Sequence, residues 1–298
     1  SLYQADLMKH LTLVAIAGAF AGIPQIAVAQ DRDLLPGDKL ILTNGVATIE
    51  GTSGGGIATW ATIAGRETDR GIGVSGHVTL VELTDFKWQS HGLSIGIANR
   101  IELSYARQNF DTQDVGAALG IGRGYTLNQD VFAAKVRLAG DLVYGDPLVP
   151  QISVGVQHKR NKDAPIAFAV GAGKASGTDF TLSATKLLLS HSVLVSATAR
   201  YTSANQNGLL GFGNGAGKGR RLQFEGSVGY QLSRRAVIGA EFRSKPDNLG
   251  LGEDDWFDLF GAYALTDNLT VTAAYADLGS IATFEKQRGA FLSAQLAF

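Results

Sequence analysis

The last eleven residues of the chain alternate between two kinds of position. One face of this stretch is apolar and ends on an aromatic ring; its members are Leu292, Ala294, Leu296 and Phe298. The other face carries Gly289, Phe291, Ser293 and Gln295. A period of two predicts a strand with different surroundings on its two sides. The last strand of a membrane barrel would place its aromatic residue at the bilayer boundary, whereas a soluble sheet could show the same alternation.

A repeated turn organises the chain upstream of this strand. Alternating runs are interrupted four times by short polar segments, at Ile97–Leu103, Leu189–Val195, Leu232–Ile238 and Leu265–Val271, with a fifth turn at Gly145–Pro150. The connections between these turns are longer and rich in glycine, asparagine and charge; they are Asp111–Gln129, Asn161–Gly177, Ala204–Arg220, Lys245–Asp255 and Asp277–Arg288. Short turns on one side and long loops on the other are typical of outer-membrane barrels.

The pattern predicts an all-β protein, an antiparallel transmembrane β-barrel. Twelve strands are expected between Gly71 and Phe298. Two more at Lys39–Glu50 and Ile57–Ala64, joined by a glycine-rich turn, would make fourteen, the count that we favour because Ala58–Ala64 alternates. Single-chain bacterial barrels have even strand numbers, so twelve is the alternative. With twelve strands, Asp31–Ala64 would be a periplasmic segment or a plug.

The two faces of the predicted strands differ in charge. Outward positions carry residues such as Phe132, Val195 and Phe257, while nearly every charged residue falls on the opposite face. A charge facing the bilayer midplane would cost about 2–4 kcal/mol, so this sorting favours a barrel over a soluble sandwich. The candidate lumen-lining residues are Glu102, Lys135, Arg137, Arg200, Glu225, Glu241, Arg243 and Asp258. They either line a weakly selective water-filled channel or pair with one another and fill a closed interior.

The N-terminal region predicts a secretory signal. Lys9 and His10 precede an uncharged apolar run of about a dozen residues, too short to span a bilayer as a helix, and Ala27-Val28-Ala29 follows. We therefore expect residues 1–29 to be removed. Residues 30–56 would then form a first strand or a periplasmic or plug segment, and residues 57–298 the outer-membrane barrel.

The composition of the chain limits the classes of ligand and partner that it can bind. The chain has no cysteine and a formal net charge of −1, so it offers neither thiolate metal ligands nor a basic surface for nucleic acid. We expect no cofactor and no metal site. The acidic run Glu253–Asp255 is more typical of a solvated loop than of a divalent-cation site. The expected partners are the lipid bilayer with its outer-membrane lipids and small polar solutes, with the oligomeric state, a homo-oligomer included, left open.

Three functions fit these observations. The first is an outer-membrane channel for passive passage of small polar solutes, without catalysis. The second is a closed structural or partner-binding barrel acting through its external loops, which a strong internal ion-pair network would favour. The third is a barrel-embedded hydrolase, which a Ser–His contact at one end of the barrel would favour. Ser94 lies in a G-x-S-x-G pattern, but inside a predicted strand rather than at a strand-to-helix turn.

Several runs between Leu40 and Phe298 resemble a proteobacterial family that is catalogued as a domain of unknown function. They are Leu42–Gly51, Ala106–Asp111, Ser183–Lys186, Gly208–Gly213, Arg243–Leu249 and Ile281–Phe284. The resemblance implies a location in the outer membrane of a Gram-negative bacterium. It implies no substrate, activity or catalytic residue.

Overall fold

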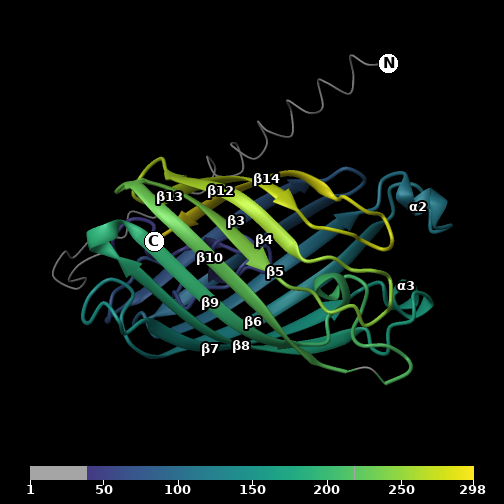
Figure 1. The fold of residues 1–298 in the computed structure, drawn as a ribbon, viewed down its shortest axis with the longest axis horizontal. Coiled ribbons are helices and arrows are strands. Elements are labelled where there is room, and N and C mark those ends of the chain that lie inside the picture. The colour runs from purple at the N-terminus through teal and green to yellow at the C-terminus, as the bar shows by residue number, and fades with distance from the viewer. Residues whose placement is uncertain (1–38, 218) are drawn as a thin grey trace, which may run out of the picture. The chain divides into compact units, whose positions relative to one another are not determined.

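The computed structural model describes residues 39–217 and 219–298; the predicted signal peptide and its cleavage site lie outside them. Twelve antiparallel strands close into a barrel in which each strand pairs with its neighbours along the chain and β14 pairs with β3 (Figure 1). The strands are β3 (Ile72–Glu82), β4 (Lys87–Ile97), β5 (Ile101–Asp111), β6 (Thr126–Ala139), β7 (Gln151–Asn161), β8 (Ser176–Leu188), β9 (Val193–Thr202), β10 (Arg221–Ser233), β11 (Ala236–Arg243), β12 (Trp256–Ala264), β13 (Leu269–Asp277) and β14 (Arg288–Ala297).

The predicted barrel is confirmed, and its strand count is twelve, the alternative, rather than the favoured fourteen. The stretches Lys39–Glu50 and Ile57–Ala64 are not wall strands. They contribute only β1 (Val46–Ala47), which pairs with β2 (Ser53–Gly54) in a separate two-stranded sheet. A strand that crosses a bilayer needs about 9–11 residues, and neither stretch supplies such a run without a break. The barrel wall therefore begins at Ile72.

The connections separate into two kinds at the two ends of the barrel. The predicted short turns connect β4 to β5, β8 to β9, β10 to β11 and β12 to β13. The loop between β6 and β7 lies at the same end of the barrel as these turns. At the other end, called here the loop end, the longer connections carry the short helices α2 (Val115–Ala118), α3 (Ala164–Ala169) and η2 (Asn205–Gly208); η1 (Leu189–His191) lies in a turn of the first end. Figure 1 shows α2 and α3 together at the loop end, with the C-terminus at the opposite one.

The outer face of the wall is apolar. Side chains that alternate with buried ones are exposed along the strands; they include Leu93, Leu103, Phe132, Leu182, Val195, Phe224, Val228, Leu259, Tyr275 and Leu292. An apolar surface of this extent is unfavourable in water but favourable in the hydrocarbon core of a bilayer. A closed barrel with this belt is an outer-membrane protein. Among the described residues, no helix is both long and apolar enough to cross a membrane.

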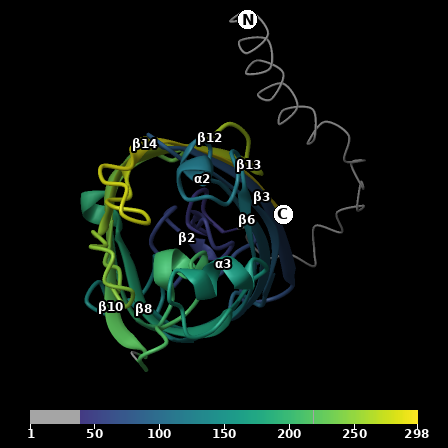
Figure 2. The same ribbon diagram turned by 90° about the vertical axis from the view of Figure 1, so that its right-hand side faces the viewer.

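The barrel encloses residues 44–65, called here the inner segment. Every residue of this segment is buried, and Figure 2 shows its strand β2 within the ring of the wall. Eight strands already enclose a space that their own side chains can fill, so a twelve-strand barrel needs additional material to exclude water. The inner segment supplies it. Cavities of about 10 Å³ and 40 Å³ lie in the interior, room for one to a few water molecules each.

Candidate functional site

The charged interior is centred on Glu50 of the inner segment. Its carboxylate is fully buried and meets three cations from three different wall strands. Arg243 donates from both terminal nitrogens, at 2.9 Å and 3.1 Å. Arg200 donates at 3.1 Å, and Lys159 completes the group as a close ion pair. One carboxylate from the segment thus joins β7, β9 and β11 across the barrel.

Two wall carboxylates balance these cations. Asp179 lies 2.8 Å from Lys159 and 3.3 Å from Arg200. Glu225 forms a close pair with Arg200 and lies 3.6 Å from Arg243. Three buried cations therefore face three buried carboxylates. This balance matters because a buried charge without a partner costs several kcal/mol.

The wall also binds the backbone of the inner segment. Glu102 accepts hydrogen bonds from the N–H groups of Ser53 and Ala64, at 3.0 Å and 2.8 Å. Lys135 donates to the carbonyl oxygens of Ser53 and Thr62, both at 2.9 Å. Glu241 accepts from the N–H of Ile57 at 3.0 Å. Charged side chains of the wall thus take the place of the neighbouring strand that this irregular backbone lacks.

A glycine run allows the segment to approach the wall closely. A Cβ atom on Gly55 would lie 1.7 Å from the Oε1 atom of Glu241. The glycine-rich stretch Gly51–Gly56, which contains Gly55, is expected from the sequence to be a turn between two wall strands. Its role in the structure is different, since it brings backbone against a buried carboxylate.

The eight predicted lumen residues are placed as follows. Seven are buried inside the barrel: Glu102, Lys135, Arg200, Glu225, Glu241, Arg243 and Asp258. Five of them contact the inner segment or its Glu50 and are described above, and Glu225 also accepts from the N–H of Thr59 at 2.6 Å. Asp258 lies opposite Glu241 on the neighbouring strand, and its Oδ1 atom has no partner among the described residues.

Arg137 lies apart from this group. Its side chain is half-buried and binds Asp141, at 3.0 Å, and the carbonyl oxygen of Gly140 in the loop after β6. It therefore orders a connection at the end opposite to the loop end. Three charged residues of the central cluster were not predicted: Glu50, Lys159 and Asp179. The last two follow the same inward parity as their neighbours Gln157 and Thr181, so the alternation could have identified them.

The loop containing η2 reaches the same cations from the loop end. The side-chain oxygen of Asn207 accepts from Lys159 at 2.7 Å and from Arg243 at 3.0 Å. Gln206 and Asn207 both have positive φ, at 44° and 60°, which costs about 1–3 kcal/mol for a residue other than glycine. Lys159 and Arg243 are therefore shared between the inner segment and an external loop.

Serine and histidine meet once inside the wall. His77 on β3 lies 3.3 Å from the hydroxyl of Ser90 on β4, and both are buried. No hydrogen bond joins this histidine to a carboxylate among the described residues, as a catalytic triad would require. Ser94 of β4 is instead paired with Ser75 of β3 at 2.7 Å. A contact at one end of the barrel would favour a hydrolase, whereas His77 lies in the middle of β3 and, within the described part of the chain, has no acid to orient it.

Two members of the acidic run in the loop between β11 and β12 bind Lys245. Glu253 pairs with Lys245 at 2.8 Å, and Asp255 accepts from the backbone N–H of Lys245 at 3.0 Å. Burial raises the pKa of Glu253 and lowers that of Lys245. Within the described ranges, no three histidine or acidic side chains are grouped as a metal site would need.

Comparison with solved structures gives outer-membrane barrels. The KdgM porin matches with a TM-score of 0.49 and 12% identity, over 75% of this chain and 99% of that one. Outer membrane phospholipase A from Escherichia coli matches with a TM-score of 0.41 and 11% identity, over 74% and 89%. The Acinetobacter baumannii outer membrane protein Omp33 matches with a TM-score of 0.40 and 9% identity, over 80% and 99%.

No curated protein matches the chain. A family model described as "Protein of unknown function (DUF3034)" matches residues 43–295, which include the whole inner segment and all of the twelve wall strands except the last two residues of β14. The resemblance found in the sequence is therefore confirmed, and the chain belongs to the DUF3034 family.

Proposed function

We propose that the protein is an outer-membrane channel for small polar solutes that its own inner segment closes. The observation that carries this proposal is the chemistry of the surface on which the segment rests. Its backbone is bound by carboxylates, Lys135 and the amide or hydroxyl groups of Gln151, Thr185 and Thr198. When the segment is absent, water can form hydrogen bonds with these groups in its place.

A wall of this kind is compatible with a wet pore. If the inner segment leaves, the residues that would line the opening are Glu102, Lys135, Arg137, Arg200, Glu225, Glu241, Arg243 and Asp258. Both signs of charge would be present at similar density, so we expect weak selectivity between anions and cations. The proposal assigns no catalytic step to any residue.

A second candidate function rests on the ion-pair network around Glu50. Six buried charges joined across the interior favour a permanently closed barrel that acts through its external loops. Moving Glu50 would separate three ion pairs at once, which is costly when no other anion takes its place. The two functions differ in one property: only in the channel does the inner segment leave the lumen of the intact protein.

Single-channel recording separates them. The mature protein and a variant lacking residues 44–65 would be refolded in detergent and added to a planar bilayer in potassium chloride. Folding of each would be checked by the shift in gel mobility on heating. We expect rare but reproducible current steps from the intact protein and frequent, uniform steps from the variant, with a reversal potential near zero in a salt gradient. An intact protein that stays silent while the folded variant conducts would support the permanently closed barrel, and a folded variant that stays silent would exclude the channel.

A further inference from the structure

The apolar outer face does not extend equally far along all strands. On β10 the exposed apolar side chains run from Leu222 to Leu232, almost the full length of the strand. On β5 they end at Tyr105, and the next outward positions toward the loop end are Arg107 and Asn109. One sector of the wall, from β4 to β7, is therefore polar on its outer face near the loop end.

The boundary of this polar surface is a row of side chains that follows the strand register. The row, called here the outer polar row, consists of consecutive partners on β4, β5, β6 and β7: His91, Arg107, Asp130 and Arg160. The next outward row toward the loop end is also polar, with Gln89, Asn109 and Asn128. In the opposite direction the next row is apolar or aromatic on β4 to β6, with Leu93, Tyr105 and Phe132. The outer polar row thus separates two surfaces of different chemistry.

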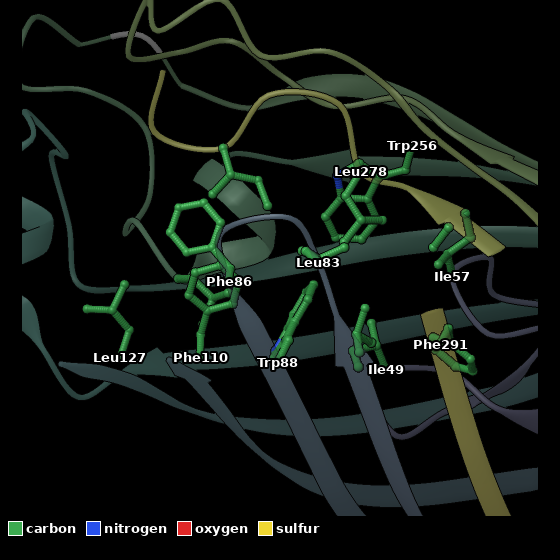
Figure 3. Close-up of a cluster of buried hydrophobic side chains, with 14 of the residues drawn as sticks. Ile49, Ile57, Leu83, Phe86, Trp88, Phe110, Leu127, Trp256, Leu278 and Phe291 are labelled. Carbon is green, nitrogen blue, oxygen red and sulfur yellow. The ribbon is translucent and has the colours of Figure 1, made fainter. Parts of the chain in front are cut away.

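The inner face of the same sector has the opposite polarity. Trp88, Phe110 and Leu127 are consecutive partners on β4, β5 and β6 and belong to the buried apolar cluster at the loop end (Figure 3). A wall in contact with hydrocarbon is apolar outside, whereas an apolar inner face with a polar outer face is typical of a sheet that faces water. This reversal indicates that the hydrocarbon of the bilayer ends at the outer polar row, which is the level of the lipid headgroups.

The outer polar row brings cations together around a single carboxylate. Asp130 is bound by Arg107 at 2.7 Å and by Lys162, just beyond β7, also at 2.7 Å. The hydroxyl of Tyr105 donates to the same carboxylate at 3.2 Å. Arg160 is exposed, and its guanidinium has no hydrogen bond or ion pair among the described residues. One carboxylate therefore faces three cations at this surface.

Other carboxylates of this sector are engaged toward the loops. Asp163 accepts from the hydroxyl of Tyr125 at 2.7 Å and from the backbone N–H of Asn128 at 2.6 Å. Asp111 accepts from a backbone N–H of the loop that follows β5, at 2.8 Å. Among the described residues, neither carboxylate forms an ion pair with the cations of the outer polar row. An anion from outside the protein would complete the charge balance of the row.

We propose that the outer polar row binds the phosphate of an outer-leaflet lipid headgroup. The phosphate oxygens accept from Arg160 and Lys162, since arginine can bind a phosphate through two parallel hydrogen bonds. The acyl chains lie against the apolar row below, where the rings of Tyr105 and Phe132 have centroids 5.1 Å apart. A two-fold contact with a second copy through this surface would place the same cations opposite each other, which is unfavourable. The site lies on the outer face, so it does not depend on whether the inner segment leaves the barrel.

Native mass spectrometry of the folded protein released from detergent tests this site by counting bound lipids. The probes are lipid A, which carries phosphate groups, and dephosphorylated lipid A with the same acyl chains. We expect one lipid A per barrel, bound about tenfold more tightly than the dephosphorylated form because the arginine–phosphate hydrogen bonds are missing there. Inorganic phosphate alone should give no bound species, because it has no acyl chains to contact the apolar row. Inorganic phosphate that binds as tightly as lipid A would overturn the assignment to a lipid.

Two exposed arginines provide the matched comparison. Arg160→Gln removes a cation that has no protein partner to lose, so the variant should fold normally and bind lipid A about tenfold more weakly. Arg234→Gln changes an exposed arginine in the turn between β10 and β11, at the opposite end of the barrel, and should leave the affinity unchanged. Lys162→Gln repeats the test at a second cation, and the shift in gel mobility on heating confirms that each variant is folded.

Three results would overturn the proposal. The first is equal affinity for lipid A in Arg160→Gln and Arg234→Gln. The second is equal binding of lipid A and its dephosphorylated form. The third is a lipid-free dimer that Arg160→Gln abolishes, which would assign the surface to a second copy of the chain.

Discussion

Glu50 is the residue on which the closed interior most depends. It lies on the inner segment, yet its three cationic partners belong to the wall. Removing one member of a buried ion pair lowers the free energy of unfolding by more than the intact pair contributes to it. The reason is that the remaining charges stay buried without a partner. The position of the inner segment therefore depends strongly on this one carboxylate.

We predict that Glu50→Gln lowers the free energy of unfolding by about 3–5 kcal/mol, measured by urea titration of the refolded protein in detergent. The same change at Glu82, whose pair with Lys87 is exposed and 3.1 Å long, should cost less than about 1 kcal/mol. Equal losses in the two variants would mean that the buried network does not hold the segment.

For individual residues, the sequence predicts which side chains point into the barrel, but it does not predict which of them contact one another. Alternation identified inward charges such as Arg200 and Glu241, because a strand turns every second side chain the same way. It could not reveal which of them meet, since that depends on shear and on a segment without regular structure. Glu50 was missed for this reason: its stretch was assigned to the wall, so its carboxylate had no predicted partners inside.

The strands are the elements that the sequence predicts best. All twelve observed wall strands overlap the expected ones, and the five predicted turns lie at one end. Periodicity fails for the inner segment because both parities of residues 44–65 are buried. There the backbone carbonyl oxygens of Thr59 and Ala61 accept hydrogen bonds from Thr198 and Gln151 of the wall, and the alternation of Ala58–Ala64 does not mark a face toward lipid.

The loop after β6 should respond to acid. Burial alone would raise the pKa of Asp141, but the N–H groups of Tyr144 and Val143 and the guanidinium of Arg137 outweigh it and lower this pKa. A lowered pKa means that the carboxylate stabilises the folded loop at neutral pH. That contribution is lost as the pH falls from the ordinary range of an aspartate through the lowered value.

We therefore predict that hydrogen-exchange protection of residues 140–150, corrected for intrinsic rates, decreases on acidification. In Asp141→Asn the protection should be low already at neutral pH and should change little with acid. An equal pH response in the wild type and the variant would show that Asp141 does not order this loop.

The inner segment and an external loop together close the barrel, and both bind the same cations of the wall. The inner segment brings Glu50, and the external loop with η2 brings Asn207; both bind Lys159 and Arg243. The same loop contributes Leu209 to the buried apolar cluster at the loop end, which also contains Trp256, and Arg243 lies over the ring of Trp256 at 5.1 Å. The charged network and the apolar cluster are thus in direct contact.

The central claim of this account is that the inner segment occupies the barrel of the folded protein. Because the chain has no cysteine, a single introduced thiol reports on one position. Ser53→Cys lies in the segment and is buried, whereas Ser190→Cys lies exposed in the turn between β8 and β9. The measurement is the rate of reaction of each thiol with a polar, membrane-impermeant maleimide in the folded protein and in urea.

We predict that Cys at position 190 reacts equally fast in both states, and that Cys at position 53 reacts at least a hundredfold more slowly in the folded state than in urea. Equal rates at the two positions in a protein shown to be folded would contradict the account, because the inner segment would then lie in water outside the barrel.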